Sequence, residues 1–140
     1  MTVTKLLERE TTDQVIGAFF DVYNTLGFGF LEHVYSMALE RELVARGRMV
    51  GREVSISIQY KGDVLTSQRL DMVVDERVVV EIKSTQVLPP TALRQVQNYL
   101  RATNLQVALL LHFGPQPRFQ RLVYSNNATD RGRPMRRERG

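Results

Sequence analysis

The chain has 140 residues, of which 43% are hydrophobic and 24% charged, and its formal net charge is +4. These values are typical of a single globular domain that is large enough to bury a core. The absence of cysteine excludes disulfides, thiolate catalysis and cysteine-based zinc sites. No apolar run is long enough to cross a membrane and the first ten residues do not resemble a signal peptide, so we expect a cytoplasmic protein.

Two amphipathic helices are predicted in the first third of the chain. Thr11 followed by Gln14 resembles a capping box, and the apolar residues after it recur at helical spacing up to Leu26. A Gly-Phe-Gly segment ends this helix. A second apolar stripe predicts a helix over residues 31–46, which Gly47 terminates.

The rest of the chain is predicted to form strands and one more helix. This helix is expected over residues 91–103, directly after two prolines. The continuous apolar run LQVALLLHF is typical of a strand that is buried on both faces. The order ααβββαββ favours an α/β fold with one mixed sheet flanked by helices. The five strands are expected at residues 50–60, 64–74, 78–84, 105–113 and 118–124.

One domain with two short extensions is predicted, because no repeat or linker interrupts the pattern. We place the domain at residues 11–125, after an N-terminal extension of residues 1–10 and before a tail of residues 126–140. The last eleven residues hold five Arg against one Asp and one Glu, a net charge of +3. Such a tail is either disordered or a contact for a polyanionic partner.

The stretch LDMVVDERVVVEIKS predicts a hairpin that carries charged residues inside its strands. If residues 75–77 form the loop, Val74 faces Val78 and Asp71 lies opposite Glu81. In this register the apolar side chains share one face, whereas a shift by one residue would mix the two faces. The predicted core face holds Leu70, Met72, Val74, Val78, Val80 and Ile82.

Asp71 and Glu81 would then have side-chain origins about 4.5–5.5 Å apart, where like charges destabilise a sheet. Such a pair shares a proton, binds a cation or is screened by basic neighbours. A divalent cation such as Mg²⁺ takes one or two carboxylates together with phosphate oxygens and waters. Lys83, on the same face, could contact a phosphate oxygen or polarise a metal-bound water, which suits phosphodiester hydrolysis. A solvated face of ion pairs that includes Arg69 would have the same spacing.

Several further motifs occur in a fixed order along the chain. The segment GFLEHVY, residues 29–35, has Gly, Glu and Tyr at the spacing G-x-x-E-x-x-Y. Downstream stand Tyr60-Lys61-Gly62, Leu70-Asp71, Glu81-Ile82-Lys83, Gln95, Asn98-Tyr99-Leu100 and Phe113-Gly114. Together these motifs resemble the GxxExxY protein family of the PD-(D/E)xK nuclease superfamily. The resemblance covers about residues 11–125 and implies a restriction-endonuclease-like core.

The resemblance implies a role for each matching residue. Asp71 and Glu81 would be acids that bind Mg²⁺ or Mn²⁺, with the carbonyl of Ile82 as a further ligand. Lys83 would orient or activate the attacking water. Glu32 would supply another acid to the metal or its waters, although an acid in the first turn of a helix is also favoured by the helix dipole alone.

Three more residues are assigned to substrate positioning on the same basis. Gln95 and Tyr99, four residues apart on one helix face, would position the substrate or the lysine. Tyr35 closes the G-x-x-E-x-x-Y motif and is assigned with them, although its place in an apolar stripe fits a core residue equally. No role is assigned to His33 or His112.

These assignments imply a divalent-metal-dependent nuclease that hydrolyses phosphodiester bonds of DNA or RNA. The alternatives are a catalytically silent nuclease fold that binds nucleic acid or protein, and a structural subunit of a larger assembly. The intact acids favour cleavage over binding alone. Because so small a chain has little surface for gripping a duplex, a homodimer or a protein partner is also expected.

Overall fold

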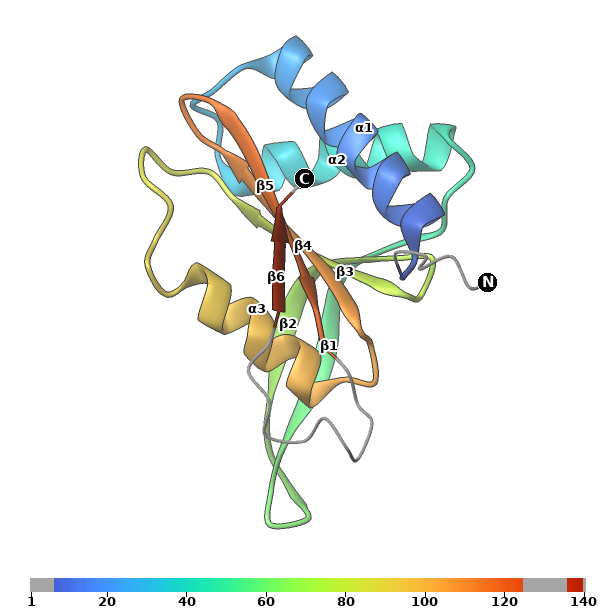
Figure 1. The fold of residues 1–140 in the computed structure, drawn as a ribbon, viewed down its shortest axis with the longest axis vertical. Helices are drawn as coiled ribbons and strands as arrows, with labels where there is room; N and C mark the ends of the chain where they lie inside the picture. The colour runs from blue at the N-terminus through green and yellow to red at the C-terminus, as the bar shows by residue number, and fades with distance from the viewer. Residues whose placement is uncertain (1–6, 125–135, 140) are drawn as a thin grey trace, which may run out of the picture.

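A computed structural model describes residues 7–124 and 136–139, and it describes the last four by their backbone. Within these residues one six-stranded sheet has helices on both faces (Figure 1). The strand order follows the chain, from β1 to β6. Only β3 and β4 are parallel, and all other neighbours are antiparallel. The elements are α1 (Arg9–Leu26), α2 (Glu32–Ala45), β1 (Val50–Tyr60), β2 (Asp63–Val74), β3 (Val78–Lys83), α3 (Ala92–Ala102), β4 (Val107–Phe113), β5 (Pro117–Val123) and β6 (Arg136–Arg139).

The predicted α/β class and the order ααβββαββ are confirmed, and the predicted elements end within a few residues of the observed ones. The capping box is wrong. Helix α1 begins at Arg9, and its N-cap Glu8 makes no side-chain cap hydrogen bond. The hydroxyl of Thr11 lies inside the helix and donates instead to the Asp75 carboxylate at 2.7 Å. None of the helices among the described residues is both long and apolar enough to cross a bilayer.

Four residues of the predicted tail form strand β6, which pairs with β5 so that Arg136 lies opposite Val123. Of the two alternatives for the tail, disorder therefore does not apply to Arg136–Arg139. The other tail residues, 126–135 and 140, lie outside the described residues, as do residues 1–6 and residue 125.

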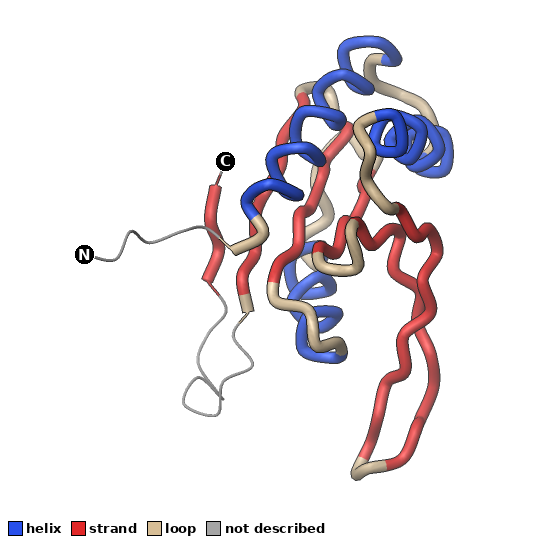
Figure 2. The backbone as a smooth tube through the Cα atoms, turned by 90° about the vertical axis from the view of Figure 1, so that its right-hand side faces the viewer, coloured by secondary structure: helices blue, strands red, loops and turns tan. Residues whose placement is uncertain are grey.

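Helices α1 and α2 cover one face of the sheet, and α3 covers the other (Figures 1 and 2). On the first face the rings of Tyr35 and Phe113 are stacked with their centroids 4.1 Å apart, and the edge of Phe19 meets Phe113 at 4.8 Å. On the second face Val96 and Leu100 of α3 pack over apolar side chains of the strands. Each face of the central strands β3 and β4 is thus buried, as the continuous apolar run of β4 predicts.

The hairpin of β2 and β3 has the predicted register, with Val74 opposite Val78 and Met72 opposite Val80. The first two residues of its three-residue turn, Asp75 and Glu76, have positive φ. Five of the six predicted core residues, all except Leu70, belong to the cluster beneath α1 and α2. The alternation of apolar and polar residues is therefore sufficient to fix this register.

Leu70 is the exception, because it packs with the α3 cluster on the opposite face. The cause lies in the neighbouring strand, where Glu53 has a φ of 53°. A positive φ is uncommon for a residue other than glycine and breaks the extended conformation. Val50, before this break, packs in the first cluster, whereas Val54, opposite Leu70, packs under α3. The alternation of both strands therefore reverses at Glu53 and Asp71.

Beyond this reversal β1 and β2 continue as a long two-stranded hairpin, which we call the arm (residues 54–70). Figures 1 and 2 show the arm projecting away from the rest of the sheet. It ends in a two-residue turn at Lys61 and Gly62, which have φ values of 52° and 87°. Two positive φ values are what a hairpin turn that matches the strand twist requires.

The turn between β2 and β3 is tied to α1 through Asp75. Its carboxylate accepts hydrogen bonds from the Thr11 hydroxyl at 2.7 Å, the Met49 amide at 3.1 Å and the Arg48 guanidinium at 3.1 Å. Burial would raise the pKa of the Asp75 carboxyl, but these three donors outweigh it, so that the pKa lies below the ordinary 3.8. Three donors on one half-buried carboxylate stabilise the folded state.

Replacing Asp75 by alanine should lower the free energy of unfolding at pH 7 by about 2–3 kcal/mol, because it leaves the Thr11, Met49 and Arg48 donors without their acceptor. Since the folded-state pKa is depressed, this contribution is present above about pH 4 and is lost as the pH falls through the folded pKa. Urea unfolding of both forms at several pH values measures it. Asp63→Ala, which removes an exposed carboxylate at the arm's turn, is the matched control, and an equal loss in that variant would contradict the assignment.

Candidate active site

The candidate site lies where the ladder between β2 and β3 stops. The last residue pair is Met72 with Val80, and the next residues along the two strands are Asp71 and Glu81. Here the backbone N–H of Ile82 donates to the Asp71 carboxylate at 2.8 Å, in place of a backbone carbonyl of the neighbouring strand. The strands therefore separate at this point, and one carboxylate fills the seam between them.

Glu81 is almost completely buried, with 4% of its surface exposed. Its Oε2 lies 3.2 Å from the Lys83 ammonium, whereas Oε1 is buried without a hydrogen-bond partner among the described residues. Burial and the charge of Asp71 together raise the pKa of Glu81 to about 8, against which Lys83 acts only in part. The predicted proximity of two acids and a lysine is thus present, and the two carboxyls repel each other when both are ionised.

Helix α3 brings two more of the predicted residues to this pair. Burial and the charges of Glu81 and Asp71 raise the pKa of the Tyr99 phenol. A hydrogen bond from Gln95 opposes that shift. Tyr99 is 5% exposed, and Gln95 lies on the exposed side of the helix. The i, i+4 spacing therefore connects the buried acids with the surface through one hydrogen-bonded pair.

Glu32 approaches the site from the other side of the sheet, at the N-terminus of α2. Its Oε2 accepts a long hydrogen bond, 3.4 Å, from the amide of Ser84, the residue after Lys83. The Ser84 hydroxyl in turn donates to the carbonyl of Phe30 at 2.5 Å. In the part of the chain that the structure describes, no three His, Cys, Asp or Glu side chains gather closely enough to hold a metal. Asp71 and Glu81 therefore form a pair, and Glu32 is not close enough to form a group of three with them.

Tyr35 does not reach the site. It is fully buried against Phe113, and its hydroxyl donates to the carbonyl of Gly27 at 2.5 Å and accepts from the Phe30 amide at 3.3 Å. A side chain with no exposed surface cannot contact a substrate in this conformation, so the assignment to substrate positioning is not supported. The apolar stripe of α2 indicated this core position. Tyr35 instead fixes the loop that leads to Glu32.

His112, to which the sequence assigned no role, supports the segment after Lys83. It lies opposite Lys83 in the parallel ladder of β3 and β4. Its Nε2 lies 2.9 Å from the Thr85 carbonyl and 3.1 Å from the Thr85 hydroxyl, so one tautomer donates to the carbonyl. The imidazole also packs against Gly114, where an added Cβ would come within 2.6 Å of the ring. In the sequence, this role was indicated only by the position of His112 near the end of an apolar strand.

The donor set fits a hard divalent cation in part. Glu81 Oε1 is a buried acceptor without a partner, and only one Asp71 oxygen is used by the Ile82 amide. Two close carboxylates supply the negative charge that such a cation neutralises, and a backbone carbonyl and waters complete its usual oxygen shell. The chemistry of this pair therefore accommodates Mg²⁺ or Mn²⁺ with two protein carboxylates.

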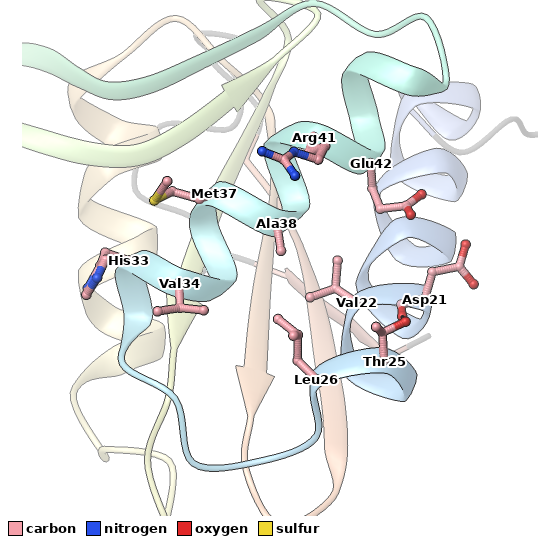
Figure 3. Close-up of a pocket in the computed structure, with 10 residues that line it drawn as sticks. All are labelled: Asp21, Val22, Thr25, Leu26, His33, Val34, Met37, Ala38, Arg41 and Glu42. Atoms are coloured by element: carbon pink, nitrogen blue, oxygen red, sulfur yellow. The ribbon is translucent and has the colours of Figure 1, made fainter.

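A groove of about 460 Å³ lies between α1 and α2 (Figure 3), the two helices that cover the sheet face opposite to α3. Val22 and Leu26 of α1 face Val34 and Ala38 of α2 across it. Its two carboxylates both bind Arg46, Asp21 at 2.6 Å and Glu42 at 3.8 Å. The groove therefore offers no free acid for catalysis, and the candidate site is the pair on the α3 face.

Comparison with known proteins gives a family for the chain and a structural relative for its fold. A family model described as the PD-(D/E)XK nuclease superfamily matches residues 9–122. The solved structure of SSO0001 is similar, with a TM-score of 0.53, 20% identity and 87% of this chain covered. The chain spans 61% of the length of SSO0001. No curated protein matches the chain.

Proposed function

The chain belongs to the PD-(D/E)XK nuclease superfamily, and on this premise we propose that it is a nuclease which hydrolyses phosphodiester bonds of DNA or RNA with the help of Mg²⁺ or Mn²⁺. The observation that carries the proposal is the pair of Asp71 and Glu81, half-buried and buried, with Lys83 at 3.2 Å from Glu81. A cation bound by this pair would supply Lewis-acid activation of a phosphate oxygen or of a water. Ile82, through its carbonyl, and Glu32, through a water, would complete the site.

Lys83 has the central electrostatic role in this proposal. Its ammonium lies 3.2 Å from Glu81 and its side chain is 18% exposed, so it would be within reach of a substrate phosphate bound beside the two acids. There it would orient the attacking water and stabilise the negative charge that develops on the phosphorus oxygens. A fixed positive charge in a partly water-excluded site stabilises such a transition state more than it would in water.

Gln95 and Tyr99 would position the substrate and the lysine. Their hydrogen bond holds the phenol beside the two acids, and the exposed amide of Gln95 can contact a phosphate or a base. Glu32 is exposed at the start of α2 and anchors Ser84, so it would hold the segment after Lys83 as well as a metal-bound water. We also propose that the chain is a GxxExxY protein of this superfamily, acts in the cytoplasm and pairs with a second copy or a protein partner.

The test is cleavage of labelled single- and double-stranded DNA and RNA, with Mg²⁺, with Mn²⁺ and with a chelator. The proposal expects cleavage of at least one substrate with either metal and none with the chelator. Products separated on denaturing gels distinguish attack at chain ends from internal attack. Cleavage that continues in the chelator would contradict a metal-dependent site.

The second candidate is a nuclease fold that binds nucleic acid without cutting it. It is favoured by one observation, that only two acids gather at the site in the described part of the chain. The same substrate panel separates the two functions, because a silent module would bind these nucleic acids and leave them intact with both metals.

Metal binding should be visible without any substrate. Mn²⁺ at about 100 times its dissociation constant should stabilise the protein by about 2.7 kcal/mol, because it binds the folded pair and not the unfolded chain. Thermal unfolding with and without Mn²⁺ measures this effect. Glu81→Gln, which keeps the shape but not the charge, should abolish it. An equal Mn²⁺ shift in both proteins would place the metal elsewhere.

A further inference from the structure

A second concavity lies beside α3, between the C-terminal half of this helix and the arm. Its volume is about 750 Å³. We call it the arm cleft. The arm contributes Ser57, Gln59 and Gln68, and the helix and the residues after it contribute Asn98, Arg101 and Asn104.

The lining of the arm cleft is polar and contains no carboxylate. Four of its side chains are amides, and Arg101 adds one positive charge. Amides and guanidinium groups hydrogen-bond both phosphate oxygens and the edges of bases. The groove between α1 and α2 differs in polarity and in charge, since its lining is mainly apolar and includes the carboxylates of Asp21 and Glu42. The arm cleft therefore has the chemistry of a nucleic-acid contact.

Helix α3 connects the arm cleft with the acids. Gln95, hydrogen-bonded to Tyr99, lies three residues before Asn98, and residues at this spacing share a helix face. From Gln95 to Ala102 the helix rises about 10 Å. About three nucleotides of a stacked, duplex-like strand, at about 3.4 Å each, cover that distance. A strand whose phosphate is bound beside Lys83 thus reaches the cleft with its next few nucleotides.

We propose that the arm cleft binds the part of a nucleic-acid strand that extends to one side of the scissile phosphate. The proposed function supplies only the position of that phosphate. Because the cleft lies at the C-terminal end of α3, strand extension in one direction reaches it and extension in the other does not. The arm is therefore a binding element that makes the recognition of longer strands directional.

The experiment uses full-length protein with Asp71→Asn, so that no substrate is consumed, in the absence of metal. Fluorescence anisotropy measures its affinity for labelled single strands of about 4 and about 16 nucleotides, as DNA and as RNA. Removing two cleft side chains with Asn98→Ala and Arg101→Ala should weaken binding of the long strand about 10-fold, because several hydrogen bonds to the strand are lost. Binding of the short strand should stay unchanged.

Arg118→Ala is the matched control, because Arg118 is exposed on β5, outside the cleft, and its loss removes the same charge. An equal loss of affinity in the control, or no loss in the cleft variant, would overturn the proposal. In protein with intact Asp71, strands extended by equal lengths on the 5′ or the 3′ side should show a raised KM in the cleft variant for one direction only. A chain that cuts nothing but passes the binding test refutes the nuclease and retains the cleft. Cleavage whose KM does not depend on strand length in either protein supports the nuclease and refutes the cleft.

Discussion

Replacing Lys83 by alanine should lower the rate of metal-dependent cleavage by about 10²–10³-fold, because it removes a preorganised positive charge from the transition state. Metal binding should be nearly intact, since both carboxylates remain. Single-turnover cleavage with saturating Mn²⁺ measures the loss, and Mn²⁺-induced thermal stabilisation checks the metal. A rate within a factor of about three of the wild type would remove Lys83 from the chemistry.

Asp71→Ala provides the contrast, because it should abolish cleavage by removing a metal carboxylate. Its effect on nucleic-acid binding should be neutral or slightly favourable, since an acid that faces phosphate has gone. Cleavage that persists in purified Asp71→Ala protein would assign the activity to another site or to a contaminant.

Replacing Glu81 by glutamine should stabilise the metal-free protein by about 1–3 kcal/mol at pH 8, because it removes the charge of a buried carboxylate beside Asp71. The pKa of Glu81 is raised to about 8 from an ordinary 4.5. The stability that the neutral form provides is therefore complete below about pH 4.5 and is lost as the pH rises through about 8. The two proteins should be equally stable at pH 4.5 and diverge up to about pH 8.

Thermal or urea unfolding between pH 4.5 and 9 measures this divergence. Asp71→Asn should act in the same direction, since it removes the other charge and retains an acceptor for the Ile82 amide. Saturating Mn²⁺ should reverse the order, because only the wild type gains the free energy of metal binding. Parallel pH profiles of the wild type and both variants would mean that the two acids do not interact in solution.

The register of the β2–β3 hairpin could be predicted because it is a local property. Apolar side chains on one face and charged ones on the other admit only one alignment, which put Met72 opposite Val80. The proximity of Asp71, Glu81 and Lys83 followed from that alignment alone. The same local pattern of α2 indicated that Tyr35 belongs to the core rather than to a site.

Features that depend on a single unusual residue or on distant partners could not be predicted. Leu70 lies on the α3 face because Glu53, in another strand, has a positive φ that no apolar pattern reveals. The arm cleft exists because α3 packs beside a hairpin more than twenty residues earlier in the chain. Strand β6 forms in a basic segment that has no alternating pattern, and its pairing with β5 is tertiary.

The ladder between β2 and β3 is much shorter than the ladders on either side of it. That ladder holds three residue pairs, whereas β1 and β2 share ten and β3 and β4 share six. The seam with the fewest rungs is thus the one that opens onto the two acids. The arm is continuous with the inner parts of β1 and β2, so this short ladder joins the strand that carries Asp71 to the strand that carries Glu81. The two acids therefore stand on opposite sides of the shortest junction between strands that the described sheet contains.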